Sequence, residues 1–246
     1  QRQMCIRDRV LKTFINFPFR GPDWKSRFIT GSALVLGGFI IPVIPFIFVL
    51  GYVLEIMRRV IQGEEPSLPP WENFGKLAAD GIKGFIASLV YLLPGLAFII
   101  GGYIFYFIVL FVSPQGGEAL LAYLIGMALF MAGLFLGLIL LTLGSIPLPA
   151  ALAHLAARGN VGAAFEVSGW WALIRSNPWG YFAAWVVTVG VAYIGYWLAI
   201  LPFYTVILCC FSYLLWAPVL FYALVVSGAL FAQFYRESSL STREIE

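Results

Sequence analysis

The residues of this sequence that could do chemistry are few, and the first of them is Glu55. This carboxylate directly follows a long apolar run and lies three and four residues before Arg58 and Arg59. Ionisable groups are costly inside a membrane and usually persist there for function, so a gating or binding role is one interpretation. The other is an ion pair with the two arginines, which share its helical face at this spacing. We favour the ion pair and keep the gating role as the alternative.

Other candidate residues lack the partners that catalysis needs. Glu64-Glu65 is similar to the paired carboxylates of intramembrane proteases, but no second helix with a histidine accompanies it. His154 is the only histidine, so a metal centre would need ligands that the sequence does not supply. Glu118 lies in a short loop, and Cys209-Cys210 lies in an uncharged run, where thiols pack as apolar groups. We therefore expect that the protein is not an enzyme, and we predict no catalytic, cofactor-binding or metal-binding residue and no cofactor.

The composition indicates what kind of fold must position these residues. Of the 246 residues, 61% are hydrophobic and 11% are charged, against about 25% charged in ordinary globular domains. The mean hydropathy is +0.92, so most of the surface must face lipid. The net charge of +3 is small, and no basic patch with interleaved aromatic residues occurs, which excludes a nucleic-acid partner. We expect an all-α, polytopic protein of the cell membrane with membrane lipid as its partner, and we leave a protein partner or a homo-oligomer open.

Apolar segments without charged residues mark the membrane helices. Four such runs extend over residues 28–54, 84–117, 119–153 and 176–235. A helix needs about 20 residues to cross the hydrocarbon core, and continuous apolar runs favour helices over the alternating strands of a barrel. Pro202 ends a helix inside the last run. We expect about six membrane segments, at residues 28–42, 45–60, 84–112, 119–150, 179–201 and 206–234.

The first apolar run is interrupted in its middle by Gly37-Gly38, Pro42 and Pro45. It can form one kinked span or two short helices that turn at the prolines. Each short helix would have about 15 residues and a length of roughly 22 Å, whereas the core is about 30 Å thick. Basic residues flank the run on both sides, and Lys and Arg accumulate in cytoplasmic loops. We therefore favour a hairpin, or a re-entrant pair that is buried against the other helices.

The distribution of Lys and Arg predicts the topology. With the hairpin, all fifteen Lys and Arg residues lie on one side of the membrane, and the loop 113–118 and the turn 202–205 on the other side contain none. The positive-inside rule assigns the basic side to the cytoplasm. We therefore expect a multi-pass protein with both termini in the cytoplasm.

Two connectors between the spans have amphipathic patterns. From Trp71 onwards, apolar residues recur every three to four positions, and opposite charges at helical spacing, such as Glu72 and Lys76, occupy the other face. This pattern predicts surface helices in the membrane interface at residues 69–83 and 160–176, the second with Asn160 as its N-cap.

Several short motifs are specific enough to compare with known families. They are Pro18-Phe19-Arg20, Pro22-Asp23-Trp24-Lys25, Gly51-Tyr52, Arg58-Arg59, Gly63, Leu68-Pro69 with Trp71, Phe74-Gly75, Asp80-Gly81, Gly159-Asn160, Ala163-Ala164-Phe165 and Arg175-Ser176-Asn177-Pro178 with Tyr181. Through these motifs, the chain from Val10 to about Tyr235 resembles the prokaryotic membrane proteins of domain of unknown function 4013. The resemblance implies a polytopic membrane protein, and it implies no activity and no functional residue.

The predicted domain organisation is simple. Residues 1–9 resemble translated adapter sequence, so we expect a non-native leader followed by a single membrane domain at residues 10–246. We expect this domain to be a non-enzymatic component that organises the membrane or binds a partner. A carrier or pore for an uncharged or lipidic solute is the alternative, which a proline-broken hairpin and a weak internal repeat would support.

Overall fold

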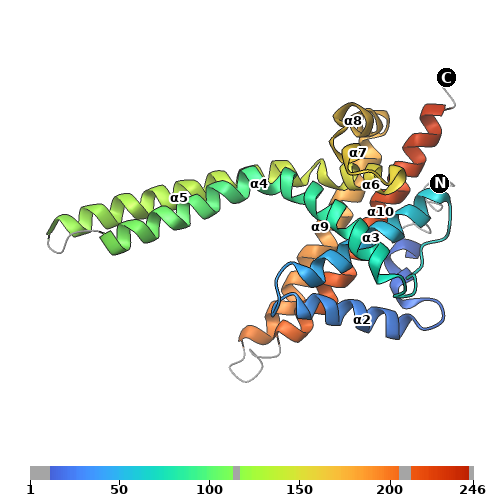
Figure 1. Ribbon diagram of the computed structural model, residues 1–246, viewed down its shortest axis with the longest axis horizontal. Coiled ribbons are helices and arrows are strands. Elements are labelled where there is room, and N and C mark those ends of the chain that lie inside the picture. The colour runs from blue at the N-terminus through green and yellow to red at the C-terminus, as the bar shows by residue number, and fades with distance from the viewer. Residues whose placement is uncertain (1–11, 113–116, 205–211, 244–246) are drawn as a thin grey trace. The chain divides into compact units, whose positions relative to one another are not determined.

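The computed structural model describes residues 12–112, 117–204 and 212–243, and within these ranges the chain forms helices and no strands (Figure 1). The elements are η1 (Phe17–Phe19), α2 (Trp24–Gly37), α3 (Ile44–Gln62), α4 (Phe74–Val112), α5 (Gly117–Ser145), α6 (Leu148–Arg158), α7 (Val161–Phe165), α8 (Val167–Ser176), α9 (Pro178–Ile200), η2 (Leu201–Tyr204) and α10 (Ser212–Arg243). The predicted all-α fold is confirmed. The expected leader at residues 1–9 and the Cys209-Cys210 pair lie outside the described residues.

Four helices in the described part of the chain are long and apolar enough to cross a membrane. They are Phe74–Val112, Leu120–Arg158, Pro178–Ile200 and Leu214–Leu240, and the second of them comprises α5 and α6 with the turn between them. The protein is therefore a multi-pass helical membrane protein. The sequence predicts about six segments, and the difference lies in the first apolar run. α2 has only 14 residues, and α3 has charged residues in its second half, so neither is a span by length and composition.

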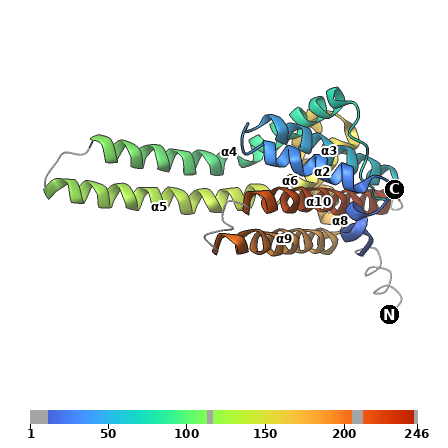
Figure 2. The same cartoon turned by 90° about the horizontal axis from the view of Figure 1, so that it is seen from below.

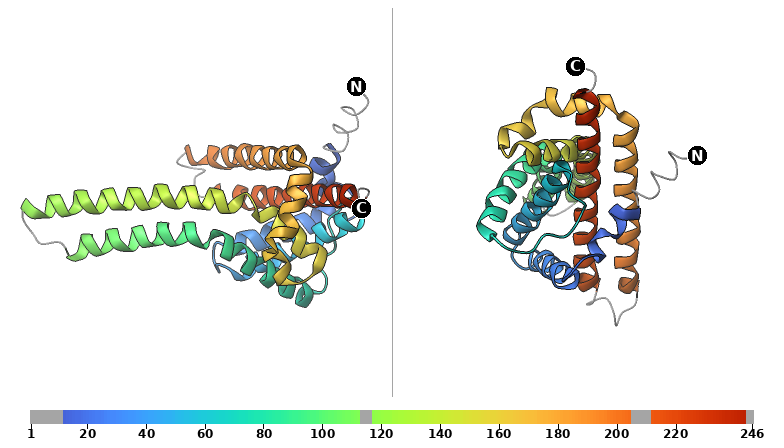
Figure 3. Two further views of the ribbon diagram at one scale, coloured as in Figure 1. Left: turned by 90° about the horizontal axis from the view of Figure 1, so that it is seen from above. Right: turned by 90° about the vertical axis from the view of Figure 1, so that its right-hand side faces the viewer.

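The chain divides into two compact units. Unit 1 comprises residues 1–85 and 149–246, and unit 2 comprises residues 86–148. The core of unit 1 is built around α10, which contacts α2, α3, α8 and α9, and most of its residues from Phe221 to Tyr235 are buried. α9 and α10 lie side by side (Figures 2 and 3). α10 continues beyond the predicted end at residue 234 to Arg243, because the polar residues after the apolar run still form a regular helix.

α2 and α3 form a hairpin at the predicted break. α2 ends at Gly37, and Pro45 lies in the first turn of α3, where its missing N–H costs no hydrogen bond. Both helices pack against α10. The expectation that this pair is buried against other helices is wrong at the tip, where Ile40 is 80% exposed.

The first connector differs from the predicted surface helix at residues 69–83. Residues 64–73 are not helical, and the helix begins at Phe74 and continues without a break into the apolar part of α4. Trp71 lies in the extended connector, where its ring stacks on that of Tyr52 with centroids 4.0 Å apart. Its Nε1 donates to the carbonyl oxygen of Arg27 at 2.8 Å, and the hydroxyl of Tyr52 donates to the carbonyl of Pro69 at 2.7 Å. These contacts hold the connector extended, so its apolar residues do not form a helical face.

The second connector forms α7 and α8 instead of one helix at residues 160–176. Asn160 is the N-cap of α7, as predicted, because its Oδ1 accepts a hydrogen bond from the N–H of Gly162 at 3.1 Å. The helix is interrupted at Glu166, whose ψ of 76° is not helical. After α8, Asn177 caps α9 by accepting from the N–H of Gly180 at 2.9 Å.

Unit 2 is an antiparallel helical hairpin formed by residues 86–112 of α4 and by α5 (Figures 1 and 2). Small residues let the two backbones approach, and a Cβ on Gly137 would lie 2.9 Å from the carbonyl oxygen of Gly95. Most large apolar side chains of this unit are exposed, as expected for helices that face lipid. α5 ends at Ser145, short of the predicted residue 150, and a turn at Ile146-Pro147 separates it from α6.

Candidate functional site

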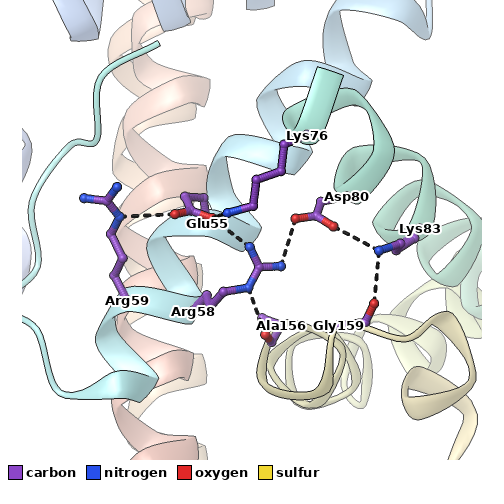
Figure 4. A network of polar contacts seen from close by, with 8 residues as sticks. All are labelled: Glu55, Arg58, Arg59, Lys76, Asp80, Lys83, Ala156 and Gly159. Atoms are coloured by element: carbon purple, nitrogen blue, oxygen red, sulfur yellow. Dashed lines mark hydrogen bonds and ion pairs between the residues drawn. The ribbon is translucent and has the colours of Figure 1, made fainter. Parts of the chain in front are cut away.

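Charged side chains from α3 and the first turns of α4 gather in one place in unit 1 (Figure 4). The group consists of Glu55, Arg58 and Arg59 of α3, Lys76, Asp80 and Lys83 of α4, and the backbone carbonyls of Ala156 and Gly159. We call these residues the charged cluster. Four cations and two carboxylates give it an excess of positive charge.

Two glycines bring α3 and α4 together beside the charged cluster. A Cβ on Gly51 would lie 1.9 Å from the carbonyl oxygen of Leu77, and a Cβ on Gly81 would lie 1.9 Å from the carbonyl oxygen of Ile47. No side chain fits at either position, so the two backbones are in direct contact. This contact determines which residues of the two helices face each other.

Arg58 is the centre of the charged cluster. Its Nη1 donates to Glu55 Oε2 at 2.7 Å, its Nη2 donates to Asp80 Oδ2 at 2.8 Å, and its Nε donates to the carbonyl oxygen of Ala156 at 3.4 Å. A guanidinium suits this place because its donors point in fixed, divergent directions. The side chains of Arg58 and Asp80 are 18% and 9% exposed, so water screens their ion pair weakly. One side chain thus joins α3, α4 and α6.

The carboxylate of Glu55 forms ion pairs with three cations. Besides Arg58, Lys76 Nζ lies 2.9 Å from Oε2 and Arg59 Nε lies 3.3 Å from Oε1. Burial alone would raise the pKa of Glu55, but the hydrogen bonds and charges of Lys76, Arg59 and Arg58 outweigh burial and hold the pKa below its ordinary value. The carboxylate is therefore ionised at neutral pH. The predicted ion pair of Glu55 with the two arginines is confirmed, and both carboxylate oxygens are engaged in it.

Lys83 connects α4 to the loop after α6. Its Nζ donates to Asp80 Oδ1 at 3.1 Å and to the carbonyl oxygen of Gly159 at 3.0 Å. Gly159 has a φ of +71°, a left-handed conformation that ends α6. The predicted ion pair between Lys76 and Glu72 is wrong, because Lys76 forms its ion pair with Glu55 on α3.

His154 lies in a second polar contact of unit 1 and is buried. Its Nδ1 is 2.8 Å from the hydroxyl oxygen of Tyr235 on α10. Its Nε2 is 3.6 Å from Glu166 Oε2, beyond hydrogen-bond distance, and Glu166 is ion-paired with Arg158. Within the described residues, no three His, Cys, Asp or Glu side chains gather as metal ligands. The histidine thus joins α6 to α10, and Gly169 of α8 packs against its ring.

The remaining candidates from the sequence lie away from the charged cluster. Glu64-Glu65 is exposed on the connector after α3. The side chain of Glu118 lies outside the described residues. Sequence reasoning missed Asp80 and Lys83 as members of the cluster, although a spacing of three residues places them on one face of a helix, where they form an ion pair. Nothing local in the sequence links Asp80 to Arg58.

Unit 2 contains an open apolar groove. It has a volume of about 550 Å³, and its lining residues include Gly101, Gly133, Phe98 and Leu136. This volume falls in the range of about 300–1,000 Å³ that is typical of small-molecule sites, but the groove has few polar groups to orient a ligand.

Comparison with known proteins identifies one family. The profile of the family described as protein of unknown function (DUF4013) matches residues 34–204, which contain the whole charged cluster, both glycines of the α3–α4 contact and all of unit 2. The matched region is narrower than the predicted resemblance from Val10 to Tyr235, and it leaves out α10. No curated protein and no solved structure matches the chain. Since the match covers more than half of the sequence, the chain belongs to the DUF4013 family.

Proposed function

We propose that the protein is a non-enzymatic component of the cell membrane that gathers anionic lipid around the exposed basic residues of unit 1, among them Lys25 and Arg175. The observation that carries this proposal is the pairing of exposed cations with tryptophan. Lys25 Nζ lies 5.8 Å from the ring centroid of Trp24, and the guanidinium of Arg175 lies 5.5 Å from that of Trp171. Tryptophan with adjacent Lys or Arg is typical of the headgroup region, where the ring is half in lipid and the cation meets phosphate.

The charged cluster supports the absence of catalysis in this proposal. Its two carboxylates hold two or three cations each, so the groups best placed for acid–base chemistry bind other parts of the same unit. A general acid or base needs a free position for a substrate proton. We therefore assign the charged cluster a structural role, in which its ion pairs and hydrogen bonds hold α3, α4 and α6 together.

We propose that the charged end of α3 and the C-terminal end of α10 face the cytoplasm, together with both termini. Gly63 at the end of α3 lies beside Arg236 on α10, since a Cβ on this glycine would be 3.2 Å from an Nη of that arginine. The C-terminal end of α10 therefore lies on the same side of unit 1 as the charged end of α3. The positive-inside rule gives this side its cytoplasmic orientation.

Cysteine labelling tests this orientation. In a chain whose three native cysteines are replaced by serine or alanine, D23C should react with a membrane-impermeant maleimide only after intact cells are permeabilised. G117C, at the start of α5, should react without permeabilisation, because it lies on the side without basic residues. Labelling of D23C from outside intact cells would contradict the proposed orientation of the N-terminal segment.

Lipid retention tests the proposed function itself. The protein is reconstituted in vesicles of phosphatidylcholine with a minority of phosphatidylglycerol and then extracted with its nearest lipids in polymer nanodiscs. Mass spectrometry should find phosphatidylglycerol enriched around the protein. The double variant K25Q/R175Q should reduce the enrichment, since each basic residue near an anionic surface contributes about 1 kcal/mol.

The matched control is E64Q/E65Q, which removes two exposed carboxylates and should preserve or increase the enrichment. Equal lipid composition around the wild-type protein and in the bulk membrane would refute the proposal. In the same vesicles, transfer of a labelled lipid between leaflets would instead support the carrier alternative, for which the groove of unit 2 is the structural candidate.

A further inference from the structure

His154 is a buried side chain of unit 1 in which only one of the two ring nitrogens has a hydrogen-bond partner. The residue is 3% exposed, and its Nδ1 is bonded to the hydroxyl of Tyr235 on α10. Nε2 is buried as well, and no described residue lies within hydrogen-bond distance of it. Buried polar groups nearly always have partners, so this nitrogen calls for an explanation.

The carboxylate of Glu166 lies just beyond this nitrogen. Glu166 Oε2 is 3.6 Å from His154 Nε2, and Glu166 is the residue whose non-helical backbone separates α7 from α8. Gly169 of α8 lies beside the same nitrogen, since a Cβ on this glycine would be 3.0 Å from Nε2. The unpaired nitrogen of His154 therefore faces the junction of α7 and α8.

The protonation state of the ring decides how well Nε2 can bind Glu166. A neutral imidazole has a single N–H, whereas an imidazolium has two. When both nitrogens carry a proton, Nδ1 donates to the hydroxyl oxygen of Tyr235 and Nε2 can donate to the carboxylate. The contact would have to shorten by only about 0.8 Å, from 3.6 Å to the roughly 2.8 Å of a charge-assisted hydrogen bond. Protonation thus offers the unpaired nitrogen a partner that already lies beside it.

The groups around the ring oppose and favour its charge. The titratable and charged groups that face it are Arg158 on α6, Glu166 at the junction and Tyr235 on α10. Burial and Arg158 oppose a charge on the ring, whereas Glu166 favours it. Glu166 is also the ion-pair partner of Arg158, and both of these side chains are about half exposed. An exposed ion pair is weak, so Glu166 can turn toward His154 at little cost.

We propose that His154 is a proton-operated switch, in which the protonated ring takes the carboxylate of Glu166 as its acceptor and draws the α7–α8 junction closer to α6. In the neutral state, Glu166 is paired with Arg158 alone and Nε2 has no partner. The added ion pair exists only below the pH at which the ring loses its proton, so α6 and α8 are held together more firmly in acid. This inference does not depend on the proposed lipid function, which the lipid-retention experiment tests separately.

Nitrogen NMR of the ring tests the switch, because His154 is the only histidine of the chain. The full-length protein is labelled with ¹⁵N-histidine, carries no histidine tag and is titrated in lipid nanodiscs across the range around pH 6.5 in which histidine ordinarily changes charge. We expect a single transition, from a ring with one N–H to an imidazolium with two. The Nε2 proton of the imidazolium should have the shift of a strong hydrogen bond, and E166Q should remove that feature.

Two variants identify the groups that set the transition. E166Q should move its midpoint to lower pH by about one unit, because a neighbouring opposite charge is lost. R158Q should move the midpoint to higher pH, because it removes a like charge and the competitor for Glu166. Both variants change exposed side chains, so folding should be preserved. The matched control is E237Q, which removes an exposed carboxylate of α10 that is bonded to Gln233 and should leave the midpoint unchanged.

A double-mutant cycle measures the consequence for stability. The coupling between H154Q and E166Q, taken from the midpoints of thermal denaturation, should be close to zero above the transition and favourable below it. A ring that stays neutral down to the pH at which the protein unfolds would overturn the switch. An E166Q midpoint equal to that of the wild type would overturn it as well, and so would a coupling that is the same above and below the transition.

Discussion

Replacing Arg58 by alanine should lower the free energy of unfolding by about 3–5 kcal/mol, the cost of removing one partner from a buried ion pair. The change deprives Asp80 of its closest cation, and the side chain of Asp80 is only 9% exposed. It also removes one of the donors to Glu55 and the contact with the carbonyl of Ala156. Asp80 would keep Lys83, and Glu55 would keep Lys76, which places the expected loss at the lower end of the range. Denaturation in mixed micelles, followed by circular dichroism, measures the change.

Arg59 provides the matched control, because it is the neighbouring arginine on the same helix and also contacts Glu55. Its single contact is 3.3 Å long and its side chain is 33% exposed, so R59A should cost no more than about 1 kcal/mol. R58K should fall between the two, since an ammonium keeps the charge but cannot reproduce the fixed geometry of the guanidinium. Equal stability of R58A and R59A would show that Arg58 is not the centre of the cluster.

The local half of the charged cluster could be predicted, and the other half could not. Glu55 and Arg58 are three residues apart on one helix, and such pairs follow from helix geometry alone. Arg58 and Asp80 lie on different helices, and their pairing depends on how the connector between them folds. That path is set by the stacking of Trp71 on Tyr52 and by the hydrogen bond to Arg27, which come from distant parts of the chain. The spacing of apolar residues predicts that Trp71 lies on the apolar face of a helix. This prediction is wrong because such spacing carries no information about contacts with distant residues.

The α2–α3 hairpin shows a second limit of sequence reasoning. Gly37, Pro42 and Pro45 mark the break because these residues end or begin helices for steric reasons that do not depend on context. Whether the tip is buried in protein or exposed to lipid does depend on context, since both environments select apolar side chains. The sequence therefore predicts the hairpin and its packing against other helices correctly and the burial of its tip incorrectly. The exposed fraction of Ile40 shows only that no described part of the chain covers the tip.

The charged cluster and the α2–α3 hairpin share helix α3. α3 has its apolar half in the hairpin and its charged half in the cluster, so one rigid helix carries both. A change that loosens the charged end is expected to change the tilt of the apolar end. The close contact of α3 with α4 fixes that tilt, and the most damaging single substitutions should therefore lie in this contact.

Replacing Gly51 or Gly81 by alanine should destabilise the protein by on the order of 3 kcal/mol or more, at or above the usual cost of overpacking. The added Cβ would lie 1.9 Å from a backbone carbonyl oxygen in either case, and a backbone cannot move aside as a flexible side chain can. Relief requires that α3 and α4 separate, which would lengthen the distances from Arg58 to Asp80 and from Lys76 to Glu55. We expect poor accumulation of both variants in membranes and a lowered midpoint of denaturation for any protein that is recovered.

Gly101 on α4 is the control for this prediction, because a Cβ at this position has no atom within 4 Å. G101A should leave stability unchanged or raise it by up to about 1 kcal/mol, since alanine has the higher helix propensity. The comparison separates a steric effect at the α3–α4 contact from a general sensitivity of α4 to substitution. If G51A and G81A were as stable as G101A, the two backbones could not be in contact, and the position of the charged cluster would need another explanation. If G51A lost stability but R58A did not, the glycine contact alone would hold α3 against α4, and the ion pairs would add only electrostatic specificity.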